Sequence, residues 1–187
     1  MPSTTPPPEH LRKEVDSVLI GETEIAARVR ELAADIERDF ADRDLLVVAL
    51  LTGTVPFLAD LIRHITLPMR LDFIGVSSYG NNTAPGELVF TKELRLEAEN
   101  RDVLLVDDIL DTGKTLRAVT DKLNALKPRS LKTCVLLEKK SRRAEKIMGD
   151  YVGFEVPDAF VVGYGLDYAE CYRNLPFIGI LKPEVHA

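Results

Sequence analysis

The residues with the clearest chemical potential are three carboxylates and a glycine turn in the stretch 103–116, which reads VLLVDDILDTGKTL. Asp107 and Asp108 follow an apolar run, and Asp111 stands in a short loop before the run Thr112-Gly113-Lys114-Thr115. Such a turn before a helix directs free backbone N–H groups outward, and the helix dipole adds partial positive charge there. The stretch is therefore predicted to bind an anion beside a set of carboxylates.

Other common motifs do not account for this stretch. A P-loop needs a glycine five residues before Gly113, but the residue there is Asp108, and the chain has no G-x-G-x-x-G run. A P-loop NTPase and a Rossmann dinucleotide site are therefore disfavoured. The histidines His10, His64 and His186 lie far apart in the sequence, which argues against a zinc site or a histidine-based triad.

The composition narrows the class of protein. A chain of 187 residues with 45% hydrophobic and 29% charged residues is long enough for one folded domain. Its net charge of −6 argues against a general nucleic-acid binder, which needs a basic face. No apolar run approaches the ~20 residues that span a bilayer, and we expect no signal peptide. Cys134 and Cys171 lack CxxC spacing, so a cytoplasmic location is expected.

The carboxylates must be positioned by the elements around them, and the hydrophobic pattern predicts these elements. Apolar runs, several of them without alternation, predict strands at 15–20, 45–51, 71–76, 103–106, 133–137, 160–162 and 177–181. Apolar residues at helical spacing predict helices over about 22–40, 57–62 and 116–126. Strands that alternate with helices indicate an α/β fold with a mostly parallel, twisted sheet flanked by helices. Ligands bind such sheets beyond the carboxyl ends of the strands.

The stretch 103–116 resembles the 5-phosphoribosyl-1-pyrophosphate (PRPP) motif of type I phosphoribosyltransferases. Other segments are similar to the hypoxanthine-guanine branch of that family: 49–61 (pyrophosphate loop and following helix), Ser78-Tyr79 (head of the mobile catalytic loop), 136–139 (strand with the purine-reading lysine) and 157–168 (segment that stacks on and reads the purine). One departure is Thr52, where family members commonly carry lysine. The bond between Leu51 and Thr52 is the candidate for the cis peptide that the family often has in this loop.

The resemblance implies the type I phosphoribosyltransferase fold. Residues 10–187 are then a single domain, with a core at about 22–150 and a small hood formed by about 10–21 and 150–187. Residues 1–9, which have four prolines between positions 2 and 8, are expected to be a flexible tail. The polar stretch 77–88 is expected to be a functional loop.

The activity that the resemblance implies is purine salvage. The 5-phosphoribosyl group of PRPP is transferred to hypoxanthine or guanine, with Mg²⁺ as cofactor, and the products are IMP or GMP and pyrophosphate. The implied partners are these small molecules, neither nucleic acid nor a membrane, and a homodimer or homotetramer is expected. The sequence does not rank hypoxanthine, guanine and xanthine as substrates.

For PRPP, the resemblance implies that Asp107 and Asp108 hold the ribose hydroxyls, directly or through Mg²⁺. The pyrophosphate loop is Leu51, Thr52 and Gly53, and the cradle of the 5′-phosphate is Asp111, Thr112, Gly113, Lys114 and Thr115. Asp167 is assigned to a second Mg²⁺ and to the purine side of the site, and Arg173 contacts pyrophosphate. For Lys114, a solvent-facing place on the helix is an equally good interpretation.

For the purine, the resemblance implies that Asp111 accepts or holds the proton of N7 as the catalytic base. Lys139 donates to the 6-oxo group, Phe160 stacks on the ring and Val161 contributes its backbone. A surface position for Lys139 and a plain core position for Phe160 are the alternatives. Ser78 and Tyr79 belong to a lid that excludes water from the site.

A second hypothesis is an RNA-binding regulator on the same fold, similar to the pyrimidine-operon attenuators with uracil phosphoribosyltransferase activity. Those proteins share the PRPP motif, but they typically have tyrosine at the position of Asp111 and need a basic face for RNA. Asp111 and the net charge of −6 both favour the enzyme.

Overall fold

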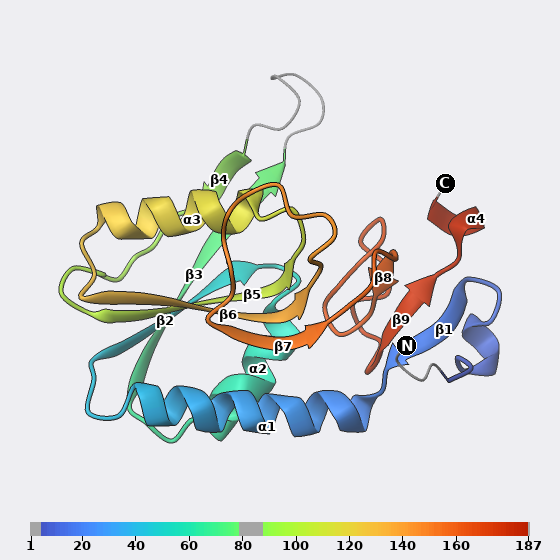
Figure 1. Cartoon of the computed structure of the whole chain (residues 1–187), viewed down its shortest axis with the longest axis horizontal. Helices are drawn as coiled ribbons and strands as arrows, with labels where there is room; N and C mark the ends of the chain where they lie inside the picture. The colour runs from blue at the N-terminus through green and yellow to red at the C-terminus, as the bar shows by residue number, and fades with distance from the viewer. Residues whose placement is uncertain (1–4, 79–87, 187) are drawn as a thin grey trace.

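The computed structural model describes residues 5–78 and 88–186 (Figure 1). The main body is a six-stranded sheet with the strand order β4-β3-β2-β5-β6-β7. Its strands are β2 (Leu45–Leu51), β3 (Met69–Ser78), β4 (Leu88–Lys92), β5 (Asp102–Leu110), β6 (Ser130–Glu138) and β7 (Tyr151–Glu155). All neighbouring strands are parallel except β4, which runs antiparallel to β3 at the edge. The predicted α/β fold with a mostly parallel sheet is confirmed.

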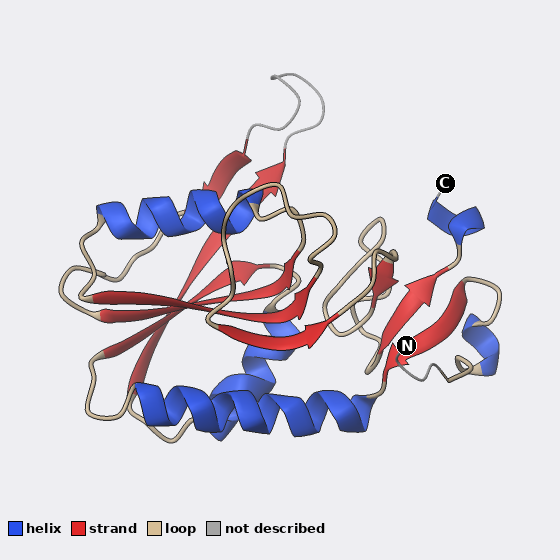
Figure 2. Cartoon of the chain, viewed as in Figure 1, coloured by secondary structure: helices blue, strands red, loops and turns tan. Residues whose placement is uncertain are grey.

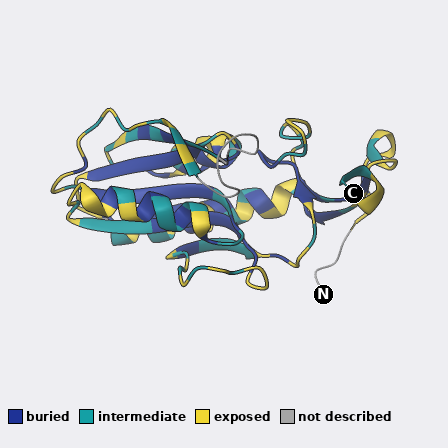
Figure 3. Cartoon of the chain, turned by 90° about the horizontal axis from the view of Figure 1, so that it is seen from above, coloured by how far each residue is buried: buried dark blue, intermediate teal, exposed yellow. Residues whose placement is uncertain are grey.

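Helices cover both faces of this sheet (Figure 2). α1 (Glu22–Asp39) and α2 (Val55–His64) pack on one face, and α3 (Lys114–Ala125) packs on the other. The residues of β2 alternate between the two cores, with Leu45, Val47 and Ala49 on the first side and Leu46, Val48 and Leu50 on the second. Burial on both faces explains why this run shows no polar alternation. Figure 3 shows the strands as the buried centre of the molecule.

A second sheet of three antiparallel strands lies beside the first (Figure 1). Its order is β1-β9-β8, with β1 (Val15–Ile20), β8 (Val161–Val162) and β9 (Ile178–Leu181). The short helices η1 (Glu9–Leu11) and α4 (Pro183–His186) flank it. This sheet is therefore made from the two stretches of chain that were expected to form a hood, and β1 pairs directly with β9.

Part of the expected flexible tail lies along β1. The backbones of Thr5 and Val18 exchange hydrogen bonds of 3.1 and 2.8 Å, and Pro7 is buried. Residues 1–4 lie outside the described part of the chain. None of the helices in the described ranges is long and apolar enough to cross a membrane.

Two strands, β4 and β7, were not predicted from the sequence. β4 begins inside the stretch assigned to a polar loop, and its alternation of half-buried and exposed residues at a sheet edge leaves only a weak hydrophobic signal. In β7, Gly153 interrupts the pattern. A β-carbon at Gly153 would lie 2.4 Å from the carbonyl oxygen of Leu136, so the glycine permits the close approach of β7 to β6.

A third strand is longer than expected. β5 was predicted to end at residue 106, with the paired carboxylates after it, but it continues to Leu110. Asp107 and Ile109 pair with Val135 and Leu137 of β6, which extends the strand past the apolar run. Asp107 and Asp108 therefore lie within the strand.

Candidate active site

A cavity of about 750 Å³ lies at the carboxyl ends of β2, β3 and β5, the edge at which ligands bind parallel sheets. A loop that precedes β9 contributes part of its wall. The predicted site residues in its lining are Leu51, Thr52, Gly53, Asp107, Asp108, Asp111, Thr112, Gly113, Thr115, Asp167 and Arg173. The structure thus gathers at one cavity most of the residues assigned to PRPP.

The turn before α3 is shaped by Gly113. Its φ of +86° lies in the left-handed region, and a β-carbon there would lie 2.9 Å from Cγ2 of Ile147. The carbonyl oxygen of Thr112 accepts hydrogen bonds from the N–H groups of Ala144 (2.9 Å) and Glu145 (3.1 Å), which fixes the turn from the other side. The turn lines the cavity, so the first N–H groups of α3 are available to an anion there.

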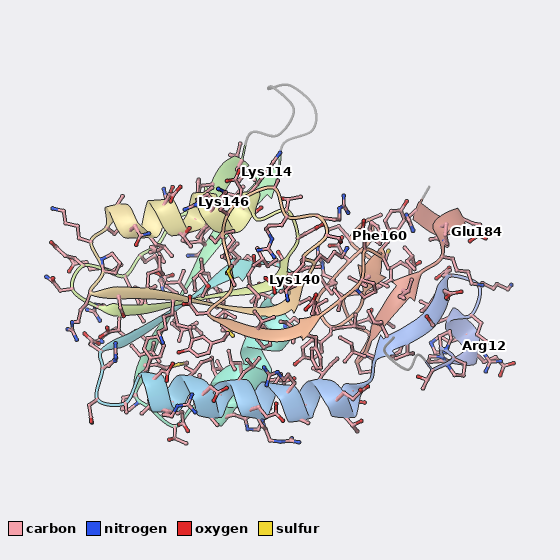
Figure 4. All side chains as sticks on the ribbon, in the orientation of Figure 1. Arg12, Lys114, Lys140, Lys146, Phe160 and Glu184 are labelled. Atoms are coloured by element: carbon pink, nitrogen blue, oxygen red, sulfur yellow. The ribbon has the colours of Figure 1, made fainter. Side chains whose placement is uncertain are left out.

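Lys114 differs from its neighbours in this turn. Its side chain is exposed at the beginning of α3, and it does not line the cavity (Figure 4). Its backbone N–H lies 3.4 Å from Oγ1 of Thr112. The structure therefore favours the solvent-facing interpretation for the side chain of Lys114.

Asp107 and Asp108 are adjacent carboxylates in the cavity. Oδ1 of Asp107 accepts hydrogen bonds from the N–H of Asp108 (3.0 Å) and from the hydroxyl of Thr54 (3.5 Å). Oδ1 of Asp108 accepts one from the N–H of Ile109 (2.8 Å). Burial and the charge of Asp108 raise the pKa of Asp107 well above its ordinary value, and burial raises the pKa of Asp108. Hydroxyl donors or a cation would stabilise the ionised pair.

Asp111 has one oxygen without a partner. Its Oδ1 is buried and accepts no hydrogen bond from the described residues, whereas Oδ2 lies 3.6 Å from Nη1 of Arg142. Nε of Arg142 lies 3.8 Å from Oδ1 of Asp158, so the guanidinium bridges two carboxylates. Buried polar atoms are nearly always paired. The free Oδ1 therefore marks a place for a hydrogen-bond donor from a ligand.

Residues 51–53, which the resemblance assigns to pyrophosphate, meet the loop before β9 through two glycines. A β-carbon at Gly53 would lie 1.8 Å from Oδ2 of Asp108, and one at Gly165 would lie 1.8 Å from the carbonyl oxygen of Gly53. Gly165 also has a φ of +101°. Only glycines allow this contact between the two backbones. The bond between Leu51 and Thr52 is cis, as the resemblance suggested.

Arg173 contacts several groups of the loop before β9, which forms another part of the cavity wall. Its Nη1 donates to the carbonyl oxygen of Gly165 (2.9 Å) and lies 3.0 Å from Oδ1 of Asp167. Its Nη2 donates to Oε2 of Glu170 at 2.9 Å. The guanidinium therefore holds this loop in shape while it lines the cavity.

Three of the residues assigned to the purine, Lys139, Phe160 and Val161, lie outside the lining of this cavity, whereas Asp111 and Asp167 belong to it. Lys139 is buried, its N–H donates to the carbonyl oxygen of Leu110 (3.0 Å), and burial lowers its pKa against the opposing charge of Asp111. Val161 is buried in β8, opposite Ile180. Phe160, immediately before β8, is 38% exposed, so it is not a plain core residue.

The remaining predicted residues belong to the expected lid. Ser78 is the last residue of β3, where the backbone pairs with Leu88 of β4. Tyr79 lies outside the described residues. The role of both in closing the site stays a prediction.

The sequence analysis missed a cation in the cavity wall. Lys92 lines the cavity, and its Nζ donates to the carbonyl oxygen of Phe73 (2.7 Å) and to Oδ1 of Asp72 (3.2 Å). Asp72 is 1% exposed and also accepts hydrogen bonds from the N–H groups of Phe73, Arg95 and Leu96. A carboxylate inside the apolar strand LDFIG was the available signal, because a buried charge needs partners.

Comparisons with known proteins agree with this geometry. Residues 19–169 match the family model described as phosphoribosyl transferase domain. A hypoxanthine-guanine phosphoribosyltransferase of Bacillus subtilis is 48% identical over 177 residues, which cover 94% of this chain and 98% of the relative. A crystal structure of a hypoxanthine phosphoribosyltransferase from Staphylococcus aureus superposes with a TM-score of 0.90 at 43% identity, covering 96% and 98% of the two chains. A hypoxanthine-guanine-xanthine phosphoribosyltransferase gives a TM-score of 0.84 at 38% identity, covering 91% and 99%.

Proposed function

The chain belongs to the phosphoribosyl transferase family, and on that premise we propose that it transfers the 5-phosphoribosyl group of PRPP to hypoxanthine or guanine. The products are IMP or GMP and pyrophosphate, which makes it an enzyme of purine salvage. The observation that carries the proposal is a single cavity lined by a helix N-terminus, the carboxylate pair Asp107 and Asp108, and the unpaired oxygen of Asp111. Each of these suits a different part of the two substrates.

The two phosphate ends of PRPP suit two backbone loops. The turn 112–115 offers N–H groups and hydroxyls at the start of α3, which suits the 5′-phosphate. Thr52 and Gly53 line the cavity across from it and suit the pyrophosphate, with Arg173 as a planar cationic donor. The loop has no lysine at Thr52, so its backbone is proposed to bind the leaving group.

We propose Mg²⁺ as the cofactor, because the donor chemistry fits it. Mg²⁺ takes one or two carboxylates, keeps several waters and binds substrate phosphates. Asp107 and Asp108 supply such oxygens, and Asp167 supplies another, while residues 5–78 and 88–186 contain no cluster of three or more His, Cys, Asp or Glu that could enclose a metal ion. When bound, Mg²⁺ would stabilise negative charge on the departing pyrophosphate. The ionised pair would accept hydrogen bonds from the ribose hydroxyls and stabilise positive charge on the ribose.

The base is proposed to lie between the cavity and Phe160. Oδ1 of Asp111 accepts the N–H at N7, so that the proton leaves the purine as N9 attacks the anomeric carbon. The ammonium of Lys139 donates to the 6-oxo group, a contact that a 6-amino group would not accept in the same way. Phe160 stacks on the purine face.

The assembly and location follow from the family alone. We propose a homodimer or homotetramer in the cytoplasm. The alternative, an RNA-binding regulator, has less support, because a net charge of −6 does not suit an RNA-binding face.

An initial-rate assay tests the function directly. The enzyme is supplied with PRPP, Mg²⁺ and one base at a time: hypoxanthine, guanine, xanthine, adenine or uracil. Turnover of hypoxanthine or guanine, abolished by chelation of Mg²⁺ and restored by its return, is the expected result. Turnover of uracil without turnover of any purine would overturn the proposal.

A further inference from the structure

The C-terminal helix covers the aromatic ring assigned to the purine. The rings of Phe160 and His186 are stacked, with centroids 4.6 Å apart and an angle of 21° between their planes. The ring of Tyr168 meets Phe160 edge-on, at 5.5 Å and 89°. Phe160 is nevertheless 38% exposed, so its neighbours leave part of the ring open.

Backbone contacts hold the segment that carries His186. The N–H of Leu181 donates to the carbonyl oxygen of Phe160 (2.8 Å), and the N–H of Lys182 donates to that of Glu14 (2.8 Å). Nζ of Lys182 donates to the carbonyl oxygen of Arg12 at 2.6 Å. The chain just before α4 is therefore fixed to Phe160 and to the residues that precede β1, and His186 follows within one helical turn.

Phe160 lies between two parts of the molecule, with α4 on one side and the six-stranded sheet on the other. α4 is on the side of β8 away from the six-stranded sheet (Figure 1), and Figure 4 places Phe160 between that sheet and α4. Lys139 and Asp111, the polar groups proposed to read the purine, belong to the end of that sheet. Asp158, two residues before Phe160, faces the same cluster through Arg142. His186 stacks on Phe160 from α4, and the sheet end that carries the polar groups lies on the other side of Phe160 from α4.

We propose that His186 is a positioning residue of the purine site, and this inference rests on the proposed function. His186 covers one face of Phe160, Tyr168 holds its edge, and the purine takes the other face, so that three aromatic rings form one stack. The residue acts through Phe160 and does not touch the reacting atoms. Stacked aromatic pairs favour a ring orientation by an amount that corresponds to about two- to tenfold in an equilibrium constant.

The test compares three variants with the wild type. His186→Ala removes the ring, His186→Phe keeps an aromatic ring, and Glu184→Ala is a control at an exposed position of the same helix (Figure 4). The KM for hypoxanthine is measured at saturating PRPP, and the KM for PRPP at saturating hypoxanthine. Melting temperatures show that each variant is folded.

The expected result is a rise of about two- to tenfold in the KM for hypoxanthine in His186→Ala, with the KM for PRPP unchanged. His186→Phe and Glu184→Ala should resemble the wild type. A lower KM for hypoxanthine in His186→Ala would mean that His186 competes with the purine for one face, and an unchanged KM would make it a bystander. Either result overturns the inference.

A double-mutant cycle with Phe160→Leu keeps the inference testable if one variant is unstable. His186→Ala should add little once the ring of Phe160 is gone, because the two residues act through one contact. Fully additive effects would overturn the positioning role. A wild type that turns over no purine would overturn the proposed function instead, so the two failures are distinguishable.

Discussion

The two halves of the site are built in different ways. The phosphate half, formed by residues 51–53 and 107–115, comes from the ends of two adjacent parallel strands in the middle of the large sheet. The proposed purine half combines Lys139, the residue after β6, with Phe160 and His186, which belong to the region of the second sheet. The phosphate half depends on two loops at the ends of paired strands, and the purine half depends on a small sheet that joins residues 15–20 with residues 161–181.

This difference separates binding of PRPP from recognition of the base. The phosphate half is supported by strands buried on both faces, so its geometry is stiff. The purine half is held by a small sheet and by backbone contacts of the C-terminal segment. We therefore expect substitutions near Phe160 to change base binding while PRPP binding is preserved, with Asp111 as the residue shared by both halves.

The largest effect is expected at that shared residue. Asp111→Asn should lower kcat by about 10²–10⁴-fold while the Kd for PRPP changes little, because the proton of N7 is accepted only during the reaction. Single-turnover rates and equilibrium binding of PRPP provide the two measurements. Asp158→Asn is the matched control, since that carboxylate also contacts Arg142. If Asp111→Asn instead abolishes PRPP binding, Asp111 is a residue of the phosphate half alone.

The next effect concerns the support beneath the phosphate half. Asp72→Asn should lower the free energy of unfolding at pH 7 by about 3 kcal/mol. The substitution removes the charge that pairs with Lys92 and turns one carboxylate oxygen into an NH2 group, so that two of the four donors to Asp72 lose their acceptor. Chemical denaturation measures this loss, and Asp121→Asn, at an exposed position of α3, is the control. The KM for PRPP should also rise in Asp72→Asn, because Lys92, the partner of Asp72, lines the cavity.

The same carboxylate gives a pH dependence of stability. Burial alone would raise the pKa of Asp72, but hydrogen bonds from Leu96, Phe73, Arg95 and Lys92 outweigh burial and lower it to about 2. A lowered pKa stabilises the folded state above the unfolded value and loses that contribution as pH falls toward 2. The wild type should therefore lose its advantage over Asp72→Asn between about pH 4 and pH 2. A constant difference across this range would show that the charge of Asp72 is not what stabilises the fold.

A smaller effect is expected within the purine half. Phe160→Leu should weaken the binding free energy of the purine by about 1–2 kcal/mol, by analogy with base stacking in proteins that bind single-stranded nucleic acids. Binding of PRPP should be unchanged. The Kd for each substrate, measured by calorimetry, separates the two. Equal losses for both substrates together with a lower melting temperature would show that the ring serves the core of the fold.

The smallest effect is expected at Lys114. Lys114→Ala should change kcat and both KM values by less than about twofold, because an exposed side chain outside the cavity contributes little. Thr115→Val is the contrasting variant, since its hydroxyl belongs to a residue that lines the cavity. A large loss of PRPP affinity in Lys114→Ala would place this ammonium in the phosphate half after all.

The difference between the phosphate half and the purine half also decided which residues could be predicted from the sequence. The turn 111–115 and its carboxylates are contiguous, and a buried parallel strand has a clear pattern, so an anion site at 107–115 was readable from residue types and spacing, whereas residues 51–53 were assigned through the family resemblance. Lys139 and Phe160 received their roles only from a family resemblance, because nothing local in the sequence connects them. His186 was set aside as an isolated histidine, and its partner became visible only when β9 was placed beside β8. Asp72 of β3 pairs with Lys92 of the edge strand β4, and this pair was not predicted because the hydrophobic pattern of β4 is too weak to identify it as a strand.

The pairing of β1 with β9 has a consequence for the order of events during synthesis. Val15 lies opposite Leu181, so the small sheet cannot close until residue 181 has been made. Translation adds roughly 5–20 residues per second, and domains begin to fold from the N-terminus. The strand and helix on either side of the phosphate turn end at residue 125, and the N–H groups of Ala144 and Glu145 that fix the turn also precede β9 in the chain. The residues of the phosphate turn are therefore synthesised before the strand that completes the small sheet beside Phe160.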